Sequence, residues 1–149
     1  MLREGEEAPD FELPSSSGVA IRLSQFRGRN VVIFFYPKDG SPGCTVENCL
    51  IRDRLREFEE LDSVVLGISR DSVESHRKFA SRHGLAHYLL SDVVGDVIRR
   101  YGALGLFGIT KRVTYIIDRQ GRVSKIIRSL DPRRHVDEAL DFLRVNLNL

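Results

Sequence analysis

A near-continuous apolar run over residues 30–36 leads within a few residues into an amphipathic helical pattern. Such a run is typical of a central strand in a sheet that is covered on both faces. Ser41 is a suitable N-cap and Pro42 a suitable first helical residue, because the N–H that proline lacks would have no intrahelical partner. The sequence therefore predicts a buried strand followed almost at once by a helix.

Both cysteines of the chain lie at this junction, Cys44 in the first turn of the expected helix and Cys49 five residues later. The unpaired N–H groups and the positive dipole end of a helix favour the thiolate, which is the reactive form of cysteine. Ile51, Leu55 and Phe58 follow Cys44 at helical spacing, so we expect Cys44 to face the core at the floor of a pocket. Cys44 is thus a candidate nucleophile.

Helix geometry rotates Cys49 by about 140° from Cys44 and separates the two Cα atoms by roughly 8 to 9 Å, beyond the ~7 Å that a disulfide spans. Pairing the two sulfurs requires local unwinding, which favours the transient disulfide of a redox cycle over a static one. Two unrelated buried thiols in a cytosolic protein are the alternative that the number and spacing of the cysteines leave open.

The residues Pro37, Ser41 and Cys44 resemble the Pro-x-x-x-Thr/Ser-x-x-Cys signature of the peroxiredoxins, which are AhpC/TSA-like thiol peroxidases. A second cysteine five residues later, together with the Tyr-Pro-Lys-Asp and Pro-Gly-Cys-Thr flanks, is similar to the peroxiredoxin Q, or bacterioferritin comigratory protein, subfamily. The similarity extends from residues 5–13 to residues 112–118. It implies that Cys44 is the peroxidatic cysteine and Cys49 the resolving cysteine.

The resemblance also implies the other site residues. The arginine that reaches the thiolate in this family corresponds to Arg112, at the start of an expected strand. Pro37 would shape and shield the loop. We expect Arg112, the Ser41 hydroxyl and the N–H groups of Gly43 and Cys44 to bind the peroxide and to stabilise the charge on its leaving oxygen. Ser41 stands where the family usually has threonine, so the hydroxyl expected to hydrogen-bond the thiolate or the peroxide is retained. The methyl group that restricts its rotamer is lost, so this bond is expected to be held less rigidly.

The function implied by the resemblance is the reduction of hydrogen peroxide and organic hydroperoxides through a Cys44 sulfenic acid and an intramolecular Cys44–Cys49 disulfide. An external dithiol such as thioredoxin would restore both thiols, without a cofactor or a metal, and the subfamily suggests a monomer or weak dimer. A thiol–disulfide oxidoreductase is one alternative, although that chemistry usually uses Cys-x-x-Cys. A redox sensor, oxidised only once, is the other.

Length and composition agree with these expectations. A chain of 149 residues, 42% of them hydrophobic, predicts one domain over residues 1–149. No segment approaches the ~20 apolar residues of a membrane span, and the first residues lack the apolar core of a secretory signal, so we expect a cytoplasmic location. Basic and acidic residues alternate at a net charge of +2, which argues against nucleic acid as a partner.

The expected fold is α/β and thioredoxin-like, with a central mixed β-sheet, helices on both faces and an N-terminal β-hairpin. The expected strands are 11–13, 19–23, 30–36, 63–69, 88–90, 112–118 and 122–128. The expected helices start at 42, run from 71 or 72 to Gly84, cover 92–101, and start again at 132.

Three of the histidines are not expected to form a further site. His83 and His87 are four residues apart, but Gly84 between them predicts the end of a helix, so we expect no metal there. His76 lies on a helical stripe and is expected to be a partly buried packing residue.

The loop that follows residue 101 contains Leu104, Leu106 and Phe107. These side chains would either line the mouth of the pocket or cover the edge of the core. We expect the second, because isolated apolar residues in loops are ordinary.

Overall fold

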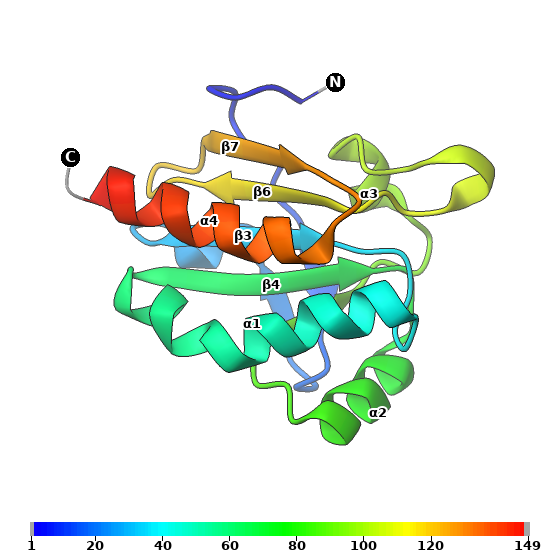
Figure 1. Cartoon of the computed structure of the whole chain (residues 1–149). Coiled ribbons are helices and arrows are strands. Elements are labelled where there is room, and N and C mark those ends of the chain that lie inside the picture. Colours follow the sequence, from blue (N-terminus) through cyan, green and yellow to red (C-terminus); the bar gives the residue numbers. More distant parts are fainter. Residues whose placement is uncertain (1, 148–149) are drawn as a thin grey trace.

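A mixed five-stranded sheet in the order β5-β4-β3-β6-β7 forms the centre of the computed structural model, which describes residues 2–147 except for the side chain of residue 147 (Figure 1). Its strands are β3 (Asn30–Phe35), β4 (Ser63–Ser69), β5 (Tyr88–Ser91), β6 (Val113–Ile117) and β7 (Val123–Arg128). β3, β4 and β5 are parallel, whereas β6 is antiparallel to both β3 and β7. β1 (Glu12–Pro14) and β2 (Ala20–Arg22) form the expected N-terminal hairpin.

Alternating residues of β3 face two separate halves of the core. Val32 and Phe34 pack under α1 (Pro42–Glu60) and α4 (Pro132–Leu147), which lie side by side across one face of the sheet (Figure 1). Val31, Ile33 and Phe35 pack on the opposite face against the N-terminal hairpin and α3 (Asp96–Arg100). A strand buried on both faces must be apolar along its whole length, which explains the run that the sequence shows here.

The helix boundaries agree with the sequence except at α3. Ser72 caps α2 (Val73–His83) by accepting a hydrogen bond from the Ser75 N–H, and Gly84 ends the helix in the left-handed conformation. The expected helix from residue 92 was too long, because α3 begins only after Gly95, which has a φ of 78°. Asp92 is buried before the helix, where its carboxylate accepts a hydrogen bond from the Ile98 N–H.

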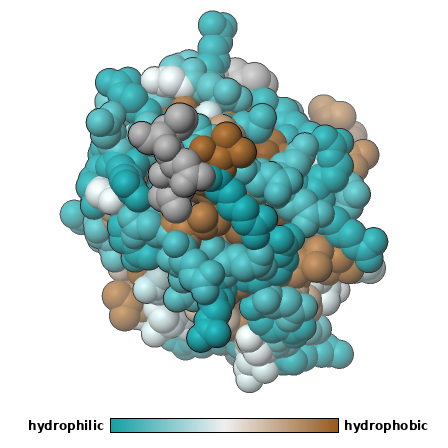
Figure 2. Space-filling view, turned by 60° about the vertical axis from the view of Figure 1, so that its left-hand side comes forward, coloured by the Kyte–Doolittle hydropathy of each residue, from teal (hydrophilic) through white to brown (hydrophobic). Residues whose placement is uncertain are grey.

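The surface on the side where α1 ends is mostly hydrophilic, with hydrophobic residues in small separate groups (Figure 2). Arg54 of α1 and Arg144 of α4 both contact Glu57, and Arg54 also reaches Asp137, so ion pairs join the outer faces of these two helices. Exposed pairs of this kind each contribute little to stability. Within residues 2–147, no helix is both long and apolar enough to span a membrane.

Candidate active site

Cys44 lies in the first turn of α1 and its side chain is fully buried. Ser41 is the N-cap and Pro42 the first helical residue, as the sequence predicts, and the Thr45 N–H donates to the Ser41 carbonyl oxygen. The stripe that continues from Cys44 along α1 packs on the sheet through Ile51 and Phe58. The candidate nucleophile therefore sits at the positive end of a helix and against the core.

Arg112 lies beside this thiol, with its Nη2 atom 3.3 Å from Cys44 Sγ. The topology explains the contact: Val113 of β6 is paired with Phe35 at the end of β3, so the preceding residue lies next to the loop that leads into α1. The contact places a permanent cation against the sulfur of the candidate nucleophile. The arginine that the family resemblance identified is thus the one that contacts Cys44.

Glu47 is a second partner of Arg112 that is not among the site residues predicted from the sequence. Its Oε1 atom accepts a hydrogen bond of 2.9 Å from Arg112 Nη1, and its side chain is 1% exposed. The two arms of the guanidinium therefore contact a carboxyl group and the thiol at once. Glu47 follows Cys44 by three residues, which is the helical spacing that could have indicated a shared face.

Burial raises the pKa of Glu47 to about 8, although the adjacent Arg112 guanidinium acts in the opposite direction. Its Oε2 atom is buried without a hydrogen-bond partner among the described residues. A neutral carboxyl group still accepts from Arg112 through Oε1, so the contact persists on protonation.

A pH dependence of stability follows from this shift. Because the folded state binds the proton of Glu47 more tightly than the unfolded state, the Glu47 contribution to the free energy of unfolding falls as pH rises from about 4.5 to about 8. Glu47→Gln should lose that contribution, so its free energy of unfolding, relative to the unmodified protein, should rise over this range. Denaturant titrations at pH 5, 6.5 and 8 check this; a constant difference between the two proteins would contradict it.

Gly43 gives Arg112 the space to reach the thiol. A Cβ atom on this residue would lie 2.9 Å from Arg112 Nη2, closer than ordinary contacts allow. Any side chain there would displace the guanidinium or its own helix turn. The position thus has a steric requirement besides the N–H group that the sequence analysis assigned to it.

Ser41 and Pro37 lie at the same end of the sheet. The Ser41 hydroxyl donates to the Lys38 carbonyl oxygen over 2.9 Å, and no hydrogen bond joins it to Cys44 in the described part of the chain. The expected bond from this hydroxyl to the thiolate is thus absent here, because the nearby carbonyl is a competing acceptor. Pro37 lines a groove of about 750 Å³ together with Arg112, Leu106 and Leu130.

The expectation that Leu104, Leu106 and Phe107 cover the core edge is wrong for two of the three. Leu106 is 82% exposed and Phe107 is 97% exposed, while Leu104 is 36% exposed. A bridge between Leu104 and Thr110 closes the base of the loop, so the residues between them project away from the core. Leu106 instead forms part of the groove beside Arg112.

Cys49 is half-buried on the same uninterrupted helix as Cys44, and both cysteines are free thiols. Five helical residues turn the two side chains by about 140° from one another. A disulfide between them therefore requires the first turn of α1 to open.

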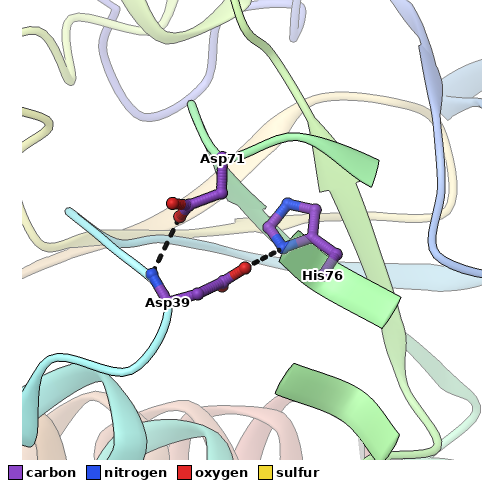
Figure 3. A group of neighbouring side chains, drawn as sticks. All are labelled: Asp39, Asp71 and His76. Atoms are coloured by element: carbon purple, nitrogen blue, oxygen red, sulfur yellow. Dashed lines mark hydrogen bonds and ion pairs between the residues drawn. The ribbon is translucent and has the colours of Figure 1, made fainter. Parts of the chain in front are cut away.

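His76 belongs to a buried polar cluster rather than to the packing stripe expected from the sequence. Its side chain is fully buried, with Nδ1 2.7 Å from Asp39 Oδ2 and Nε2 3.0 Å from the Leu90 carbonyl oxygen. Asp71 completes the cluster by accepting from the Asp39 N–H over 2.8 Å (Figure 3). Apolar spacing on a helix does not reveal such a partner, because Asp39 comes from a distant loop.

The Asp39, Asp71 and His76 atoms lie within 4.8 Å of one another, close enough to share a cation. Both ring nitrogens of His76 already lie within hydrogen-bond distance of oxygen atoms of the protein, Asp39 Oδ2 and the Leu90 carbonyl. The cluster fixes the loop between β3 and α1 to α2, which is its evident structural role.

Several comparisons with known proteins agree with this geometry. A model of the AhpC/TSA family matches residues 5–126. Peroxiredoxin Bcp of Bacillus subtilis (strain 168) is 40% identical over 148 residues, which cover 94% of this chain and 94% of that protein. The crystal structure of Peroxidoxin BcpB from Mycobacterium tuberculosis matches with a TM-score of 0.91 and 39% identity, covering 97% of this chain and 98% of the other.

A third similar protein is the bacterioferritin comigratory protein of Xanthomonas campestris, whose structures were described for its alkyl peroxide reduction activity. It matches with a TM-score of 0.90 and 31% identity, over 97% of this chain and 99% of that one. The thioredoxin-like fold and the family resemblance expected from the sequence are confirmed. The chain belongs to the AhpC/TSA family, as a peroxiredoxin of the Bcp and peroxiredoxin Q group.

Proposed function

We propose that this protein reduces peroxides by a two-cysteine cycle in which Cys44 is oxidised and Cys49 resolves the oxidised form. The observation that carries the proposal is the contact of 3.3 Å between the Arg112 guanidinium and the buried Cys44 thiol at a helix N-terminus. A helix dipole and a fixed cation together favour the thiolate.

The first step is attack of the Cys44 thiolate on one peroxide oxygen, in line with the O–O bond. The S–O bond forms as the O–O bond breaks, and the second oxygen leaves with the bonding electrons and takes up a proton to become water or an alcohol. Sulfur is thereby oxidised to a sulfenic acid while the peroxide is reduced. Arg112 and the N–H groups of Gly43 and Cys44 stabilise the negative charge on the leaving oxygen.

The hydroxyl of Ser41 and the ring of Pro37 complete this site in the proposal. Ser41 donates to the Lys38 carbonyl oxygen in the reduced protein, so it reaches a bound peroxide only after rotation about its Cα–Cβ bond. Pro37 lines the groove together with Arg112, the residue that contacts Cys44.

The apolar part of the groove supports organic hydroperoxides as substrates besides hydrogen peroxide. Leu106, Leu130 and Ile109 line it beside Arg112 and are all exposed to solvent. An alkyl chain placed there would be removed from water while its peroxide group faces the guanidinium. The alkyl peroxide reduction described for the Xanthomonas campestris relative is in line with this assignment.

In the second step the Cys49 thiol attacks the sulfur of the Cys44 sulfenic acid. A disulfide forms and water leaves, so no further oxidant is needed. An external dithiol, thioredoxin or a similar protein, then reduces the disulfide by thiol–disulfide exchange. Cytoplasmic location, a single domain over residues 1–149, and a monomeric or weakly dimeric state stay predictions.

Replacement of the resolving cysteine tests this cycle. Cys49→Ser should consume about one equivalent of peroxide per chain at a normal rate and then stall or, with excess peroxide, overoxidise to the sulfinic acid, because Cys44 sulfenic acid has no intramolecular partner. Stopped-flow oxidation followed by turnover with thioredoxin and its reductase measures both phases. Sustained turnover at the unmodified rate would contradict the assigned role of Cys49, and a single slow oxidation in both proteins would contradict the function itself.

A further inference from the structure

His87 is a buried histidine that the peroxidase mechanism does not use. It lies between α2 and β5, is 5% exposed, and its Nε2 atom is 2.8 Å from Asn48 Oδ1. Its Nδ1 atom is buried and has no hydrogen-bond partner among the described residues. Burial lowers the pKa of His87 to about 4, so the ring is neutral at neutral pH and its one hydrogen, on Nε2, is donated to Asn48.

Asn48 connects this histidine to the backbone of the nucleophile. Its side chain is also buried, and its Nδ2 atom donates to the Cys44 carbonyl oxygen over 2.9 Å. Two consecutive hydrogen bonds thus run from His87 through Asn48 to Cys44. The carbonyl they reach belongs to the helical turn that must open before Cys44 can meet Cys49.

The other end of the segment is fixed as well. Asp39 is tied to His76 and Asp71 at the end of the loop that precedes α1 (Figure 3). Between Asp39 and Asn48 lies Gly40, with a φ of 80° and open space where a Cβ atom would stand. Residues 40–47 are therefore bounded by two buried polar contacts. Arg112 holds the side chains of Cys44 and Glu47 in the turn, whereas Asn48 holds its backbone at the Cys44 carbonyl.

We propose that Asn48 and His87 are positioning residues that keep the first turn of α1 wound and so set the rate at which oxidised Cys44 reaches Cys49. This inference rests on the proposed function. Condensation of the Cys44 sulfenic acid with the Cys49 thiol releases water and competes with a second peroxide molecule, which oxidises the sulfenic acid to sulfinic acid. The pair therefore determines how much peroxide the enzyme tolerates before it is overoxidised.

Weakening the pair should speed disulfide formation. Asn48→Ala removes both hydrogen bonds, and His87→Phe removes one and keeps an aromatic ring of similar size. We expect the first-order rate of disulfide formation to rise about 5-fold in Asn48→Ala, less in His87→Phe, and little in His87→Gln, whose amide still donates to Asn48. The peroxide concentration at which half of the protein carries Cys44 as sulfinic acid should also rise most in Asn48→Ala, less in His87→Phe and little in His87→Gln.

The experiment mixes each reduced protein with hydrogen peroxide, quenches at intervals and quantifies sulfenic acid, disulfide and sulfinic acid by mass. Ile51→Val is the matched control, since it truncates a buried side chain of the same helix that takes no part in either hydrogen bond of Asn48. The second-order rate of Cys44 oxidation should stay within about twofold in all variants, because the Arg112 contact is intact.

Equal rates of disulfide formation in the unmodified protein, Asn48→Ala and His87→Phe would overturn the inference while leaving the peroxidase function intact. An equal rise in Ile51→Val would also overturn it, because general destabilisation would then explain the effect. Absence of Cys44 oxidation in the unmodified protein would instead refute the proposed function. If Asn48→Ala does not fold, the rates of disulfide formation in His87→Phe and His87→Gln decide alone. A faster rate in His87→Phe supports the inference, and equal rates overturn it.

Discussion

Cys44→Ser is expected to lower peroxide turnover by about 10³-fold or more, to a rate close to that of the protein-free reaction. The serine hydroxyl has nearly the size of the thiol but is not ionised at neutral pH, so Arg112 and the helix dipole have no anionic nucleophile to stabilise. A coupled assay with thioredoxin, thioredoxin reductase and hydrogen peroxide measures the loss.

The fold should survive this change, since Cys44 is free and is one of many buried residues of the core. Thermal unfolding of Cys44→Ser and Cys49→Ser, run side by side, provides the control. Turnover in Cys44→Ser at more than a few per cent of the unmodified rate would show that another residue attacks the peroxide.

Arg112→Ala is expected to slow the oxidation of Cys44 by about 10²-fold, the usual cost of removing a donor that stabilises charge in a transition state. Arg112 contacts the thiol through Nη2 and Glu47 through Nη1, so the alanine variant also leaves a buried acid without its partner. Because burial keeps Glu47 largely protonated at neutral pH, the variant leaves an unsatisfied buried carboxyl group, which costs about 1–3 kcal/mol of stability.

Two further variants separate chemistry from stability. Arg112→Lys keeps a positive charge but lacks the planar fork that reaches two acceptors, so we expect an intermediate rate of oxidation. Glu47→Gln keeps the shape of the acceptor and should slow oxidation by less than about tenfold, since the contact to Cys44 remains. Stopped-flow measurement at several peroxide concentrations gives each second-order rate constant. A normal rate in Arg112→Ala would remove Arg112 from the site.

Local signals explain most of what could be predicted from the sequence. The start of α1 follows from Ser41 and Pro42, and the end of α2 follows from Gly84, because caps depend on residues next to one another in the chain. The start of α3 was misplaced, since Asp92 is a strong local start signal that the left-handed Gly95 overrides.

The contacts that complete the site are tertiary, and the three-residue spacing of Cys44 and Glu47 is the one local sign of them noted above. Glu47 and Asn48 have the polar side chains of an exposed helix face, yet the fold buries both against Arg112 and His87. Likewise, the partner of His76 comes from a loop 37 positions earlier in the chain, at Asp39. Family resemblance supplied Arg112, which composition alone would not have singled out among the other arginines.

The most direct test of the peroxidase cycle is a single oxidation of the fully reduced protein. One equivalent of hydrogen peroxide is added, the remaining thiols are alkylated, and the modified peptides are mapped by mass. The proposed function predicts rapid loss of both thiols and a peptide pair linked through Cys44 and Cys49. Slow oxidation, or recovery of both cysteines in alkylated form, would contradict the activation of Cys44 by Arg112 and with it the proposed cycle.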